Sequence, residues 1–491
     1  MRYHTCVMRI YWLRAAIHST WHFTALCIGV VLGVLSAALW RSDGAVWAIL
    51  GVGLFLLSII RHRRFLLLVA IVGGMLIGNW RGSIGQQTYL QYRAMYGRHV
   101  QLAGIISDDV DSSARGQAII HLADVTDSGR KIGGKVWVSL NAENASRLRR
   151  SDALAVDGVL VEGFGTYSGS MYLPTIVSAS REQPGDQALV VRDDFAAHVT
   201  RAIPEPGASL GIGFLLGQKR GLPGHLLEAL QIAGLTHIIV ASGYNLTILV
   251  RLARRLLERT SKYLATLAGA CLIVGFITIT GLSPSMTRAG LVAGLGLWAW
   301  YYGRRFHPFT LLVLAMALTV LWNPSYVWGD IGWALSFAAF AGVMLLAPLV
   351  QAYFYGNQKP PFIVQLVIET ISAQLATAPI ILLAFGQFSN IAPISNLLIL
   401  PFIPLAMLLV AVAGAAAYIF PVAAPVFGWP ADILLKAMVW VIDKTASVEW
   451  AQSHWQLSGW GVGMWYGVLA AAGGYVLYRT RYRLFKANII E

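Results

Sequence analysis

The sequence is poor in charged residues and in cysteine. Only 12% of its 491 residues are Asp, Glu, Lys or Arg, whereas about a quarter of a soluble domain is charged. The three cysteines, Cys6, Cys27 and Cys271, are too few and too scattered to indicate a disulfide framework or a zinc site. Since 57% of the residues are hydrophobic and the mean hydropathy is +0.62, the composition is that of a membrane protein.

Sequence signatures of common catalytic machinery are also absent. The GxxxxGK(S/T) pattern of an ATP-binding loop does not occur, so the chain contains no recognisable ATP motor. The 11 histidines are scattered singly, and no spacing suggests a zinc site. We therefore expect that the chain is not an enzyme, holds no metal and needs no cofactor.

The net charge of +14 does not by itself indicate a nucleic-acid partner. Much of the surplus lies in short basic clusters beside apolar runs, which is where the positive-inside rule places the cytoplasmic loops of a membrane protein. The clusters lie at 61–64, 251–255, 304–305 and 479–483. We therefore use the charge to predict topology rather than DNA binding.

Residues 1–90 are predicted to form amino-terminal transmembrane helices. Apolar runs lie at 21–40, 45–60 and 65–80, and the basic residues ahead of the first run favour a cytoplasmic amino terminus. A cleaved signal peptide is the alternative, but the two runs that follow closely favour an uncleaved anchor. Three crossings then place the next segment outside the cytoplasm.

That next segment, 95–182, has the pattern of a small β-domain. Five short strand-like runs are separated by Gly, Asp, Ser and Asn, which predicts a closed barrel with the OB fold as a good candidate. OB folds often bind single strands on aromatic platforms and in basic grooves. Nine Lys or Arg face ten Asp or Glu between 98 and 182, so only local groups could bind DNA, and a solvated charged edge is the alternative. The candidate DNA-binding residues are Arg130, Lys131, Lys135, Trp137, Arg147, Arg149 and Arg150.

The segment 188–230 is predicted to be amphipathic or interfacial. Residues 188–203 have the pattern of an amphipathic helix that could lie on the membrane surface. In the following stretch, 207–223, an apolar run lies too close to a lysine and an arginine for a conventional span. An interfacial or re-entrant segment fits this stretch better.

The most informative stretch is GLTHIIVASGYNLTIL at 234–249. It is apolar enough to enter a bilayer, yet its middle carries His237, Ser242 and Asn245. Polar side chains at membrane depth are expensive and usually face a partner or a water-filled cavity. A Ser-Gly pair also weakens a helix there. The stretch therefore predicts either a kinked helix bonded to its neighbours or a broken helix that lines a solute path.

Other isolated polar residues lie in the later apolar runs. Arg288 starts the returning helix of a hairpin, where it could snorkel to the outer surface or face the path. Asp330 is placed to cap a helix, while Gln374 and Asn396 could make interhelical contacts or line the path. The residues predicted to line or support a channel are His237, Ser242, Asn245, Arg288, Asp330, Gln374 and Asn396.

These motifs resemble those of the ComEC competence proteins, polytopic channels implicated in DNA uptake. The central stretch fills the pattern GL-x-H-(apolar)4-SG-x-(H/N), one family motif precedes it at 215–223, and others follow in order at 280–289, 330–337 and 372–401. Asn245 stands where many members have a second histidine, and Ala334 where the family has glutamine. The residues that fill the central motif are Gly234, Leu235, His237, Ser242, Gly243 and Asn245.

The resemblance implies a fold, a function and partners. It implies a multi-pass protein of the bacterial cytoplasmic membrane that passes one transforming DNA strand, with an OB-like domain after the first helices and a channel domain at 231–486. It also implies single-stranded DNA and membrane lipid as partners. An extracytoplasmic DNA receptor, a separate nuclease and a cytoplasmic helicase or motor would act beside it. Many members carry a metallo-β-lactamase-like domain, but its H-x-H-x-D-H cluster does not occur here.

Together, pattern and resemblance predict a polytopic α-helical membrane protein with about ten to twelve transmembrane helices and an inserted extracytoplasmic OB-like β-barrel. Two other functions remain open at this point. A secondary transporter for a small solute would also use broken helices with polar midplane residues. An intramembrane serine protease would use Ser242 and His237, but side chains five residues apart on one helix point over 100° apart.

Overall fold

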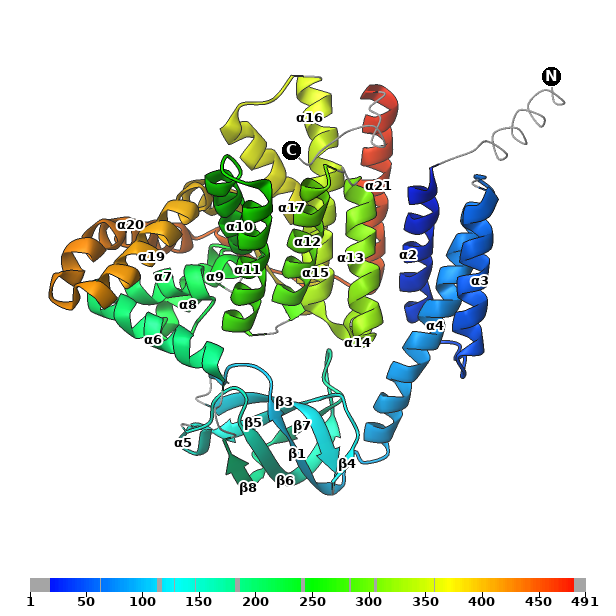
Figure 1. Cartoon of the computed structure of the whole chain (residues 1–491), viewed down its shortest axis with the longest axis horizontal. Coiled ribbons are helices and arrows are strands. Elements are labelled where there is room, and N and C mark those ends of the chain that lie inside the picture. Colours follow the sequence, from blue (N-terminus) through cyan, green and yellow to red (C-terminus); the bar gives the residue numbers. More distant parts are fainter. Residues whose placement is uncertain are drawn as a thin grey trace. The chain divides into compact units, whose positions relative to one another are not determined.

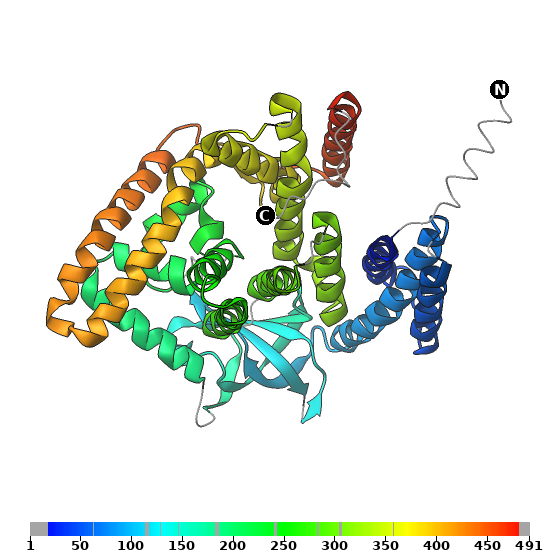
Figure 2. The same cartoon turned by 45° about the horizontal axis from the view of Figure 1, so that its top comes forward.

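The computed structural model falls into two compact units, which are described separately (Figures 1 and 2). Unit 1 comprises Met1–Gly185 and Pro308–Trp333, and unit 2 comprises Asp186–His307 and Ala334–Glu491. The structure describes residues 18–61, 63–112, 117–127, 129–145, 147–181, 186–239, 243–281, 284–303, 307–356 and 358–480.

Unit 1 begins with three helices that lie side by side, α2 (Ser19–Ser36), α3 (Val46–Arg61) and α4 (Leu66–Arg93). Glycines bring α2 and α4 into backbone contact, as in the small-xxx-small packing of membrane helices. A Cβ on Gly78 of α4 would lie 2.1 Å from the carbonyl oxygen of Val30 in α2, so only glycine fits there.

The same unit contains α13 (Pro308–Trp322), α14 (Ser325–Gly329) and the start of α15 (Ile331–Ala341). The Thr24 and Thr310 hydroxyls lie 2.9 Å apart and join α2 to α13. Arg81 of α4 donates to the carbonyls of Leu321 and Trp322 at 2.8 Å each. It thereby satisfies two of the carbonyls that the end of α13 leaves without a helical partner.

The predicted β-domain is a closed barrel in unit 1. Strand β1 pairs with both β3 and β6, β5 pairs with β3 and runs parallel to β7, and β7 returns to β6. This order and the short helix before the fourth barrel strand are those of an OB fold, as predicted. The elements are β1 (His99–Ile106), β2 (Asp111–Ser112), β3 (Gln117–Asp127), β4 (Arg130–Lys131), β5 (Lys135–Asn141), α5 (Ala142–Ala145), β6 (Ala153–Glu162), β7 (Gly169–Tyr172) and β8 (Thr175–Ser180).

Alternation along the strands builds the barrel core. In β3 every second residue from Ala118 to Leu122 is buried, which is the pattern of a strand with one face inward. Tyr92, near the end of α4, is fully buried in the same core and donates its hydroxyl proton to the carbonyl of Gly133 at 2.6 Å. The last helix before the barrel is therefore anchored in it.

Apart from turns and loops, the described residues of unit 2 are helical except for one short pair of strands. Its amphipathic helix α6 packs on α19 and α20, with Leu189, Ala196 and Val199 buried, and all ten residues of α7 are buried. Its elements are α6 (Gln187–Ala202), α7 (Gly207–Leu216), α8 (Gly224–Ile232), α9 (Thr236–Ile239), α10 (Gly243–Leu257), α11 (Lys262–Thr280), α12 (Pro284–Tyr301), the rest of α15, the π-turn Gly342–Leu346, α16 (Ala347–Tyr355), α17 (Phe362–Phe385), β9 (Gln387–Ser389), α18 (Ala392–Ile399), the 3-10 turns Leu400–Phe402 and Pro421–Ala423, α19 (Ile403–Ile419), α20 (Ala424–Ala446), β10 (Gln452–His454) and α21 (Gly459–Thr480).

Within the described ranges, seven segments are long and apolar enough to cross a membrane, and three shorter helices are also apolar. This confirms a polytopic helical membrane protein with an inserted barrel; the number of ten to twelve crossings stays a prediction. The seven segments are Ser19–Ser36, Leu66–Arg93, Lys262–Thr280, Ile331–Tyr355, Phe362–Phe385, Ala392–Ile419 and Pro421–Ala446, and the shorter helices are Val46–Ile60, Gly207–Leu216 and Pro308–Trp322.

Candidate functional site

The first candidate site in unit 2 surrounds the turn at Gly234, between α8 and α9. Gly234 has φ +70°, and a Cβ there would lie 2.6 Å from the Cβ of Ala392, so the turn requires glycine. Helix α8 ends at this turn. The hydroxyl of Ser389 donates to the carbonyl of Ile232 at 2.6 Å, and that of Ser395 donates to the carbonyl of Ala233. We call this cluster the Gly234 joint.

One predicted polar residue bonds within the Gly234 joint, and a second lies next to it in sequence. Gln374 of α17 donates from Nε2 to the carbonyl of Ser389 at 2.8 Å, and so holds the segment whose hydroxyl caps α8. Asn396 follows Ser395 on α18 and is 7% exposed; its buried Oδ1 has no hydrogen-bond partner among the described residues. Motifs that lie more than 130 residues apart in sequence therefore meet here.

His237 stands at the edge of the same joint and is exposed. Its Nδ1 lies 3.1 Å from the carbonyl oxygen of Gly234. Because a carbonyl can only accept, Nδ1 carries the proton, and Nε2 of a neutral ring remains an acceptor. The ring is thus fixed by the backbone turn, with its second nitrogen available to a solute or water.

A second joint is made by Asn245, in the first turn of α10. The side chain is fully buried, and Nδ2 donates to the carbonyls of Phe214 at 2.9 Å and Ile238 at 3.2 Å. These carbonyls lie in the last turns of α7 and α9, where helices leave acceptors without a partner. One amide therefore ties three short helices together. We call this contact the Asn245 joint.

Arg288 lies inside unit 2 and does not snorkel to its surface. The residue is 4% exposed, and its Nε and Nη1 atoms are buried. The next residue, Ala289, has its Cβ 3.0 Å from where a Cβ on Gly243 would lie, so α10 and α12 approach closely at this level. Ser242, predicted to act beside Asn245, lies outside the described residues.

Asp330 belongs to unit 1 and caps a helix, as its sequence position predicts. Its Oδ1 accepts a hydrogen bond from the backbone N–H of Trp333 at 2.8 Å, which satisfies a donor in the first turn of α15. The Trp333 indole in turn donates to the Thr319 hydroxyl at 3.0 Å. Asp330 is therefore positioned by a different unit from the other predicted channel residues.

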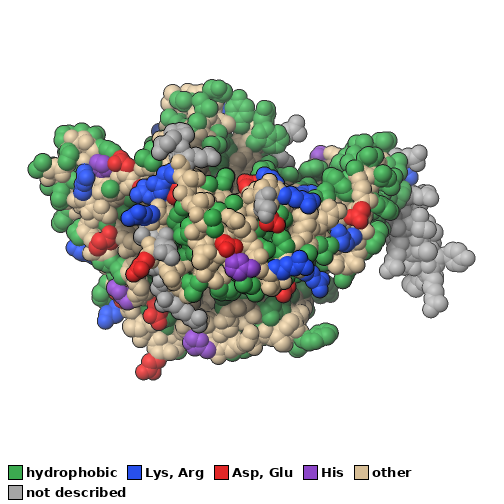
Figure 3. Space-filling model, turned by 90° about the horizontal axis from the view of Figure 1, so that it is seen from below, with side chains coloured by type: hydrophobic (Ala, Val, Ile, Leu, Met, Phe, Trp, Pro, Cys, Tyr) green, Lys and Arg blue, Asp and Glu red, His purple; other side chains and the backbone are tan. Residues whose placement is uncertain are grey.

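The lysines and arginines of the barrel that were predicted to bind DNA are not equally available to a DNA strand. The Nζ atom of Lys131 lies 2.7 Å from a carboxylate oxygen of Asp124, and that of Lys135 lies 3.7 Å from one of Asp108. Arg150 is only 6% exposed, which contradicts its place in an exposed footprint. The side chains of Arg130, Arg147 and Arg149 are exposed. On the face drawn in Figure 3, acidic and basic side chains are interspersed and form no continuous basic patch.

Trp137 is part of an aromatic cluster that sequence patterning did not reveal. Its ring centroid lies 5.5 Å from that of Phe164 and 5.3 Å from that of Tyr172. Tyr167 continues the cluster, 5.5 Å from Phe164 and 5.1 Å from His121. Phe164 is 50% and Tyr172 62% exposed. The only sequence signal was the density of aromatic residues between 164 and 172.

This aromatic cluster lies where OB folds usually bind their ligands. Strands β3 and β5 are the second and third barrel strands, and 163–168 connects the fourth to the fifth; the ligand surface of OB folds is built from such elements. In the loop, Gly165 touches the turn that precedes α15, since a Cβ on Gly329 would lie 2.2 Å from the Gly165 carbonyl oxygen. The cluster therefore stands beside the turn that carries Asp330.

A half-buried carboxylate lies next to the aromatic cluster. Burial of Asp108 favours its neutral form, but the hydrogen bond with His121, the charge of Lys135 and the 2.8 Å hydrogen bond from Ser107 together hold the pKa of Asp108 below its usual range. Burial and the charge of Asp108 raise the pKa of the Tyr167 phenol. Asp108 thus stays ionised and neutralises Lys135, and Tyr167 stays protonated.

In the part of the chain that the structure describes, no group of three or more His, Cys, Asp or Glu is placed to hold a metal ion.

Comparison with known proteins places this chain in a family. A family model described as "Competence protein" matches residues 214–480, more than half of the chain. Among curated proteins, the chain is similar to ComE operon protein 3 of Bacillus subtilis (strain 168), with 26% identity over 230 residues. That match covers 46% of this chain and only 29% of the relative's length. No solved structure matches the chain. Because the family model covers the greater part of it, the chain belongs to the competence protein family.

Proposed function

We propose that this protein is a channel in the bacterial cytoplasmic membrane and that it passes one strand of transforming DNA. The observation that carries the proposal is the set of polar side chains that apolar helices of unit 2 hold at two joints. His237 and Gln374 bond at the Gly234 joint, and Asn396 lies next to it in sequence. Asn245 forms the other joint, and Arg288 is buried separately on α12. Membership of the competence protein family supports the same role.

The chemistry of these groups suits a polyanion. A DNA strand that crosses a hydrocarbon core of ~30 Å needs hydrogen-bond donors along its route. Asn245 and Gln374 donate to backbone carbonyls and so support the interrupted backbone that would line this route, and Arg288 supplies one fixed positive charge. A path with many fixed cations would hold the strand too tightly, because conduction requires binding weak enough for release. The energy for transport would come from a separate cytoplasmic helicase or motor.

The barrel would present the incoming strand. Bases of any identity can stack on aromatic rings, and each stacked base contributes about 1–3 kcal/mol to single-strand binding. Trp137, Phe164 and Tyr172 form such a platform, whereas Lys131 and Lys135 already lie beside carboxylates. Binding to the barrel should therefore be weak and should depend more on stacking than on charge. A DNA receptor outside the membrane and a separate nuclease would complete the pathway.

Transformation frequency of competent cells tests the conduit. Arg288→Ala should reduce transformation at least tenfold while DNA binding at the cell surface and protein level stay near wild type, because the proposed path loses the positive charge of this arginine. The matched control is Arg255→Ala, which removes an exposed arginine from the end of α10. Normal transformation by well-expressed Arg288→Ala protein would show that this arginine is not on the path. If the Arg288→Ala protein does not accumulate, Arg288 is needed for the stability of the protein rather than for passage of the strand.

Cysteine labelling tests the side of the membrane. We expect an impermeant reagent to label Ser178→Cys on the barrel in intact or outer-membrane-permeabilised cells, and to label Thr260→Cys after α10 only in lysed cells. Both positions are exposed. The background must lack Cys6, Cys27 and Cys271, since Cys271 is exposed. Labelling of Ser178→Cys only after lysis would overturn the proposed topology.

A further inference from the structure

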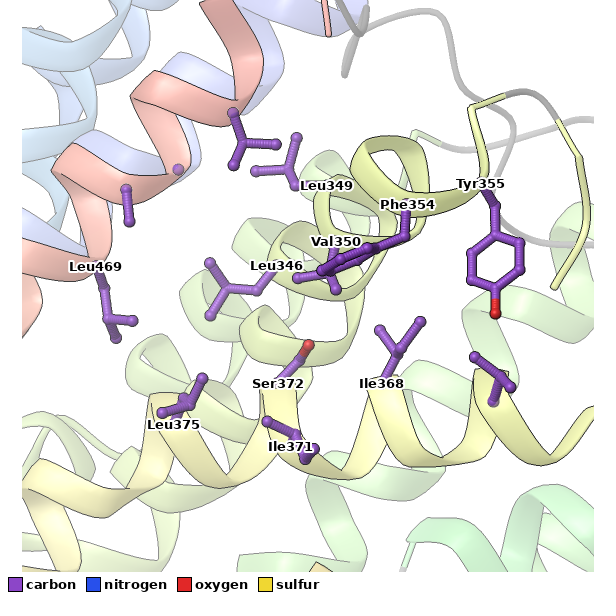
Figure 4. Close-up of a pocket in the computed structure, with 14 residues that line it drawn as sticks. Leu346, Leu349, Val350, Phe354, Tyr355, Ile368, Ile371, Ser372, Leu375 and Leu469 are labelled. Carbon is purple, nitrogen blue, oxygen red and sulfur yellow. The ribbon is translucent and has the colours of Figure 1, made fainter. Parts of the chain in front are cut away.

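Helices α16, α17 and α21 of unit 2 enclose an apolar groove of about 670 Å³. Figure 4 shows Leu346, Leu349 and Val350 on one side, Ile371 and Leu375 of α17 below, and Leu469 of α21 opposite. The polar groups in its lining are the hydroxyls of Ser372 and Tyr355. A groove of this size is large enough for a small apolar ligand.

A hydrogen-bonded clamp joins α17 to α21 at Leu375, which lines the groove. Pro379 has no N–H, so the carbonyl of Leu375 lacks its helical donor. The Trp465 indole donates to that carbonyl at 3.0 Å, and the Tyr466 hydroxyl donates to the carbonyl of Ala376 at 2.8 Å. About two turns further along α21, the small residues Ala472 and Gly473 line the groove and leave its space unfilled.

The groove is open on one side and deep on the other. Among its lining residues, Phe354 is 71% and Ile371 41% exposed, whereas Leu349 is 5% and Ile368 9% exposed. Two of the three walls belong to Ile331–Tyr355 and Phe362–Phe385, which are apolar enough to cross a membrane, and α21 forms the third. The surrounding solvent at that depth consists of lipid acyl chains.

We propose that this groove binds one acyl chain of an anionic phospholipid. Two cations lie close in sequence to lining residues and could contact the headgroup. Lys359 is in the loop between the lining residues Tyr355 and Val364, and Arg479 follows the lining residue Val476 by one turn of α21. Basic groups beside membrane helices attract anionic headgroups. The chain's own residues 481–491 suit the groove poorly, because they carry two arginines and a lysine.

Two adjacent glycines offer a matched pair of variants. Gly473 lines the groove, and the nearest atom to a Cβ there is Leu349 Cδ1 at 3.8 Å, so Gly473→Leu should fill the space without a clash. Gly474 has nothing within 4 Å and does not line the groove. Gly474→Leu therefore adds the same side chain to the same helix without blocking the site.

The test uses the full-length protein in vesicles that contain phosphatidylglycerol with a photoreactive acyl chain. Mass spectrometry should find the label concentrated on peptides from 346–375 and 469–476. Gly473→Leu should reduce this label at least fivefold, and Gly474→Leu should leave it unchanged. Ile371→Trp, which fills the groove from α17, should reproduce the loss if Gly473→Leu lowers the protein level. Unlabelled phosphatidylglycerol should compete better than phosphatidylcholine.

Three outcomes would overturn the proposal. Label spread evenly over the exposed apolar helices, and unaffected by Gly473→Leu and Ile371→Trp, would mean ordinary annular lipid. Equal competition by both phospholipids would remove the headgroup assignment. Efficient disulfide-linked dimer formation by Gly473→Cys in membranes would show that a second copy of the chain fills the groove.

Discussion

Two buried asparagines, one in each unit, show how differently the units treat polar groups in apolar helices. Asn79 of α4 is 2% exposed and bonds to Ser36, to the carbonyl of Trp40 and to Ser42, all in or just after α2. Asn245 of α10 is fully buried and donates to carbonyls at the ends of two other helices. One asparagine fastens a neighbouring loop, whereas the other replaces missing helical hydrogen bonds.

The helices around the two residues differ in the same way. Around Asn79 they are long and continuous, with 18 residues in α2 and 28 in α4, and they touch through glycines. Around Asn245 they are shorter, with ten residues in α7, four in α9 and 15 in α10. Interrupted backbone at membrane depth is tolerated only inside protein or along a cavity. Unit 1 therefore has the character of an anchor, and unit 2 has the interrupted helices that the proposed path requires.

The largest expected effect is on the anchor. Gly78→Leu should prevent α2 and α4 from packing, because even a Cβ at this position would overlap the Val30 carbonyl. Overpacking of this kind typically costs about 1–3 kcal/mol, and a backbone clash should cost more. The amount of protein in the membrane fraction should fall severely. Gly53→Leu in α3, where nothing lies within 4 Å, is the control and should accumulate normally. Equal levels of the two variants would contradict the rigid anchor.

A smaller effect separates the two asparagines. Asn245→Leu leaves the carbonyls of Phe214 and Ile238 without this donor, at a cost of about 1–3 kcal/mol for each buried group. We expect transformation to fall at least tenfold while the protein remains in the membrane, and further if Ser242→Leu is added. Asn79→Leu should instead lower the protein level and leave transformation per molecule unchanged. If both variants behave alike, the distinction between anchor and path fails.

Much of this arrangement was predictable from local sequence patterns. Apolar runs predicted the polytopic helical membrane protein, short strand-like runs separated by Gly, Asp, Ser and Asn predicted the barrel, and Asp330 was placed correctly as a helix cap. These features depend on residues close together in the chain. The motif order likewise indicated the competence family, which the family model confirms.

The contacts that define the sites were not predictable, because they join distant segments. The aromatic cluster requires β5 to lie parallel to β7, with Trp137 opposite Ser170, and no local pattern gives that register. The clamp joins Trp465 to a carbonyl 90 residues away. Arg150 was expected on the surface because arginine usually is, but the fold buries it.

The smallest expected effect contrasts stacking with charge on the barrel. Tyr172→Ala should weaken binding of single-stranded DNA to the purified full-length protein about fivefold, near the lower end of what one stacked base contributes. The dependence of affinity on salt should not change, because no charge is lost. Arg149→Ala should weaken binding less and reduce the slope of affinity against salt by about one unit or less. Tyr475→Ala, at an exposed position on α21, is the control. Were Arg149→Ala to weaken binding more than Tyr172→Ala, the footprint would be electrostatic, and the exposed arginines Arg130, Arg147 and Arg149 would replace the aromatic cluster as the surface that receives the strand.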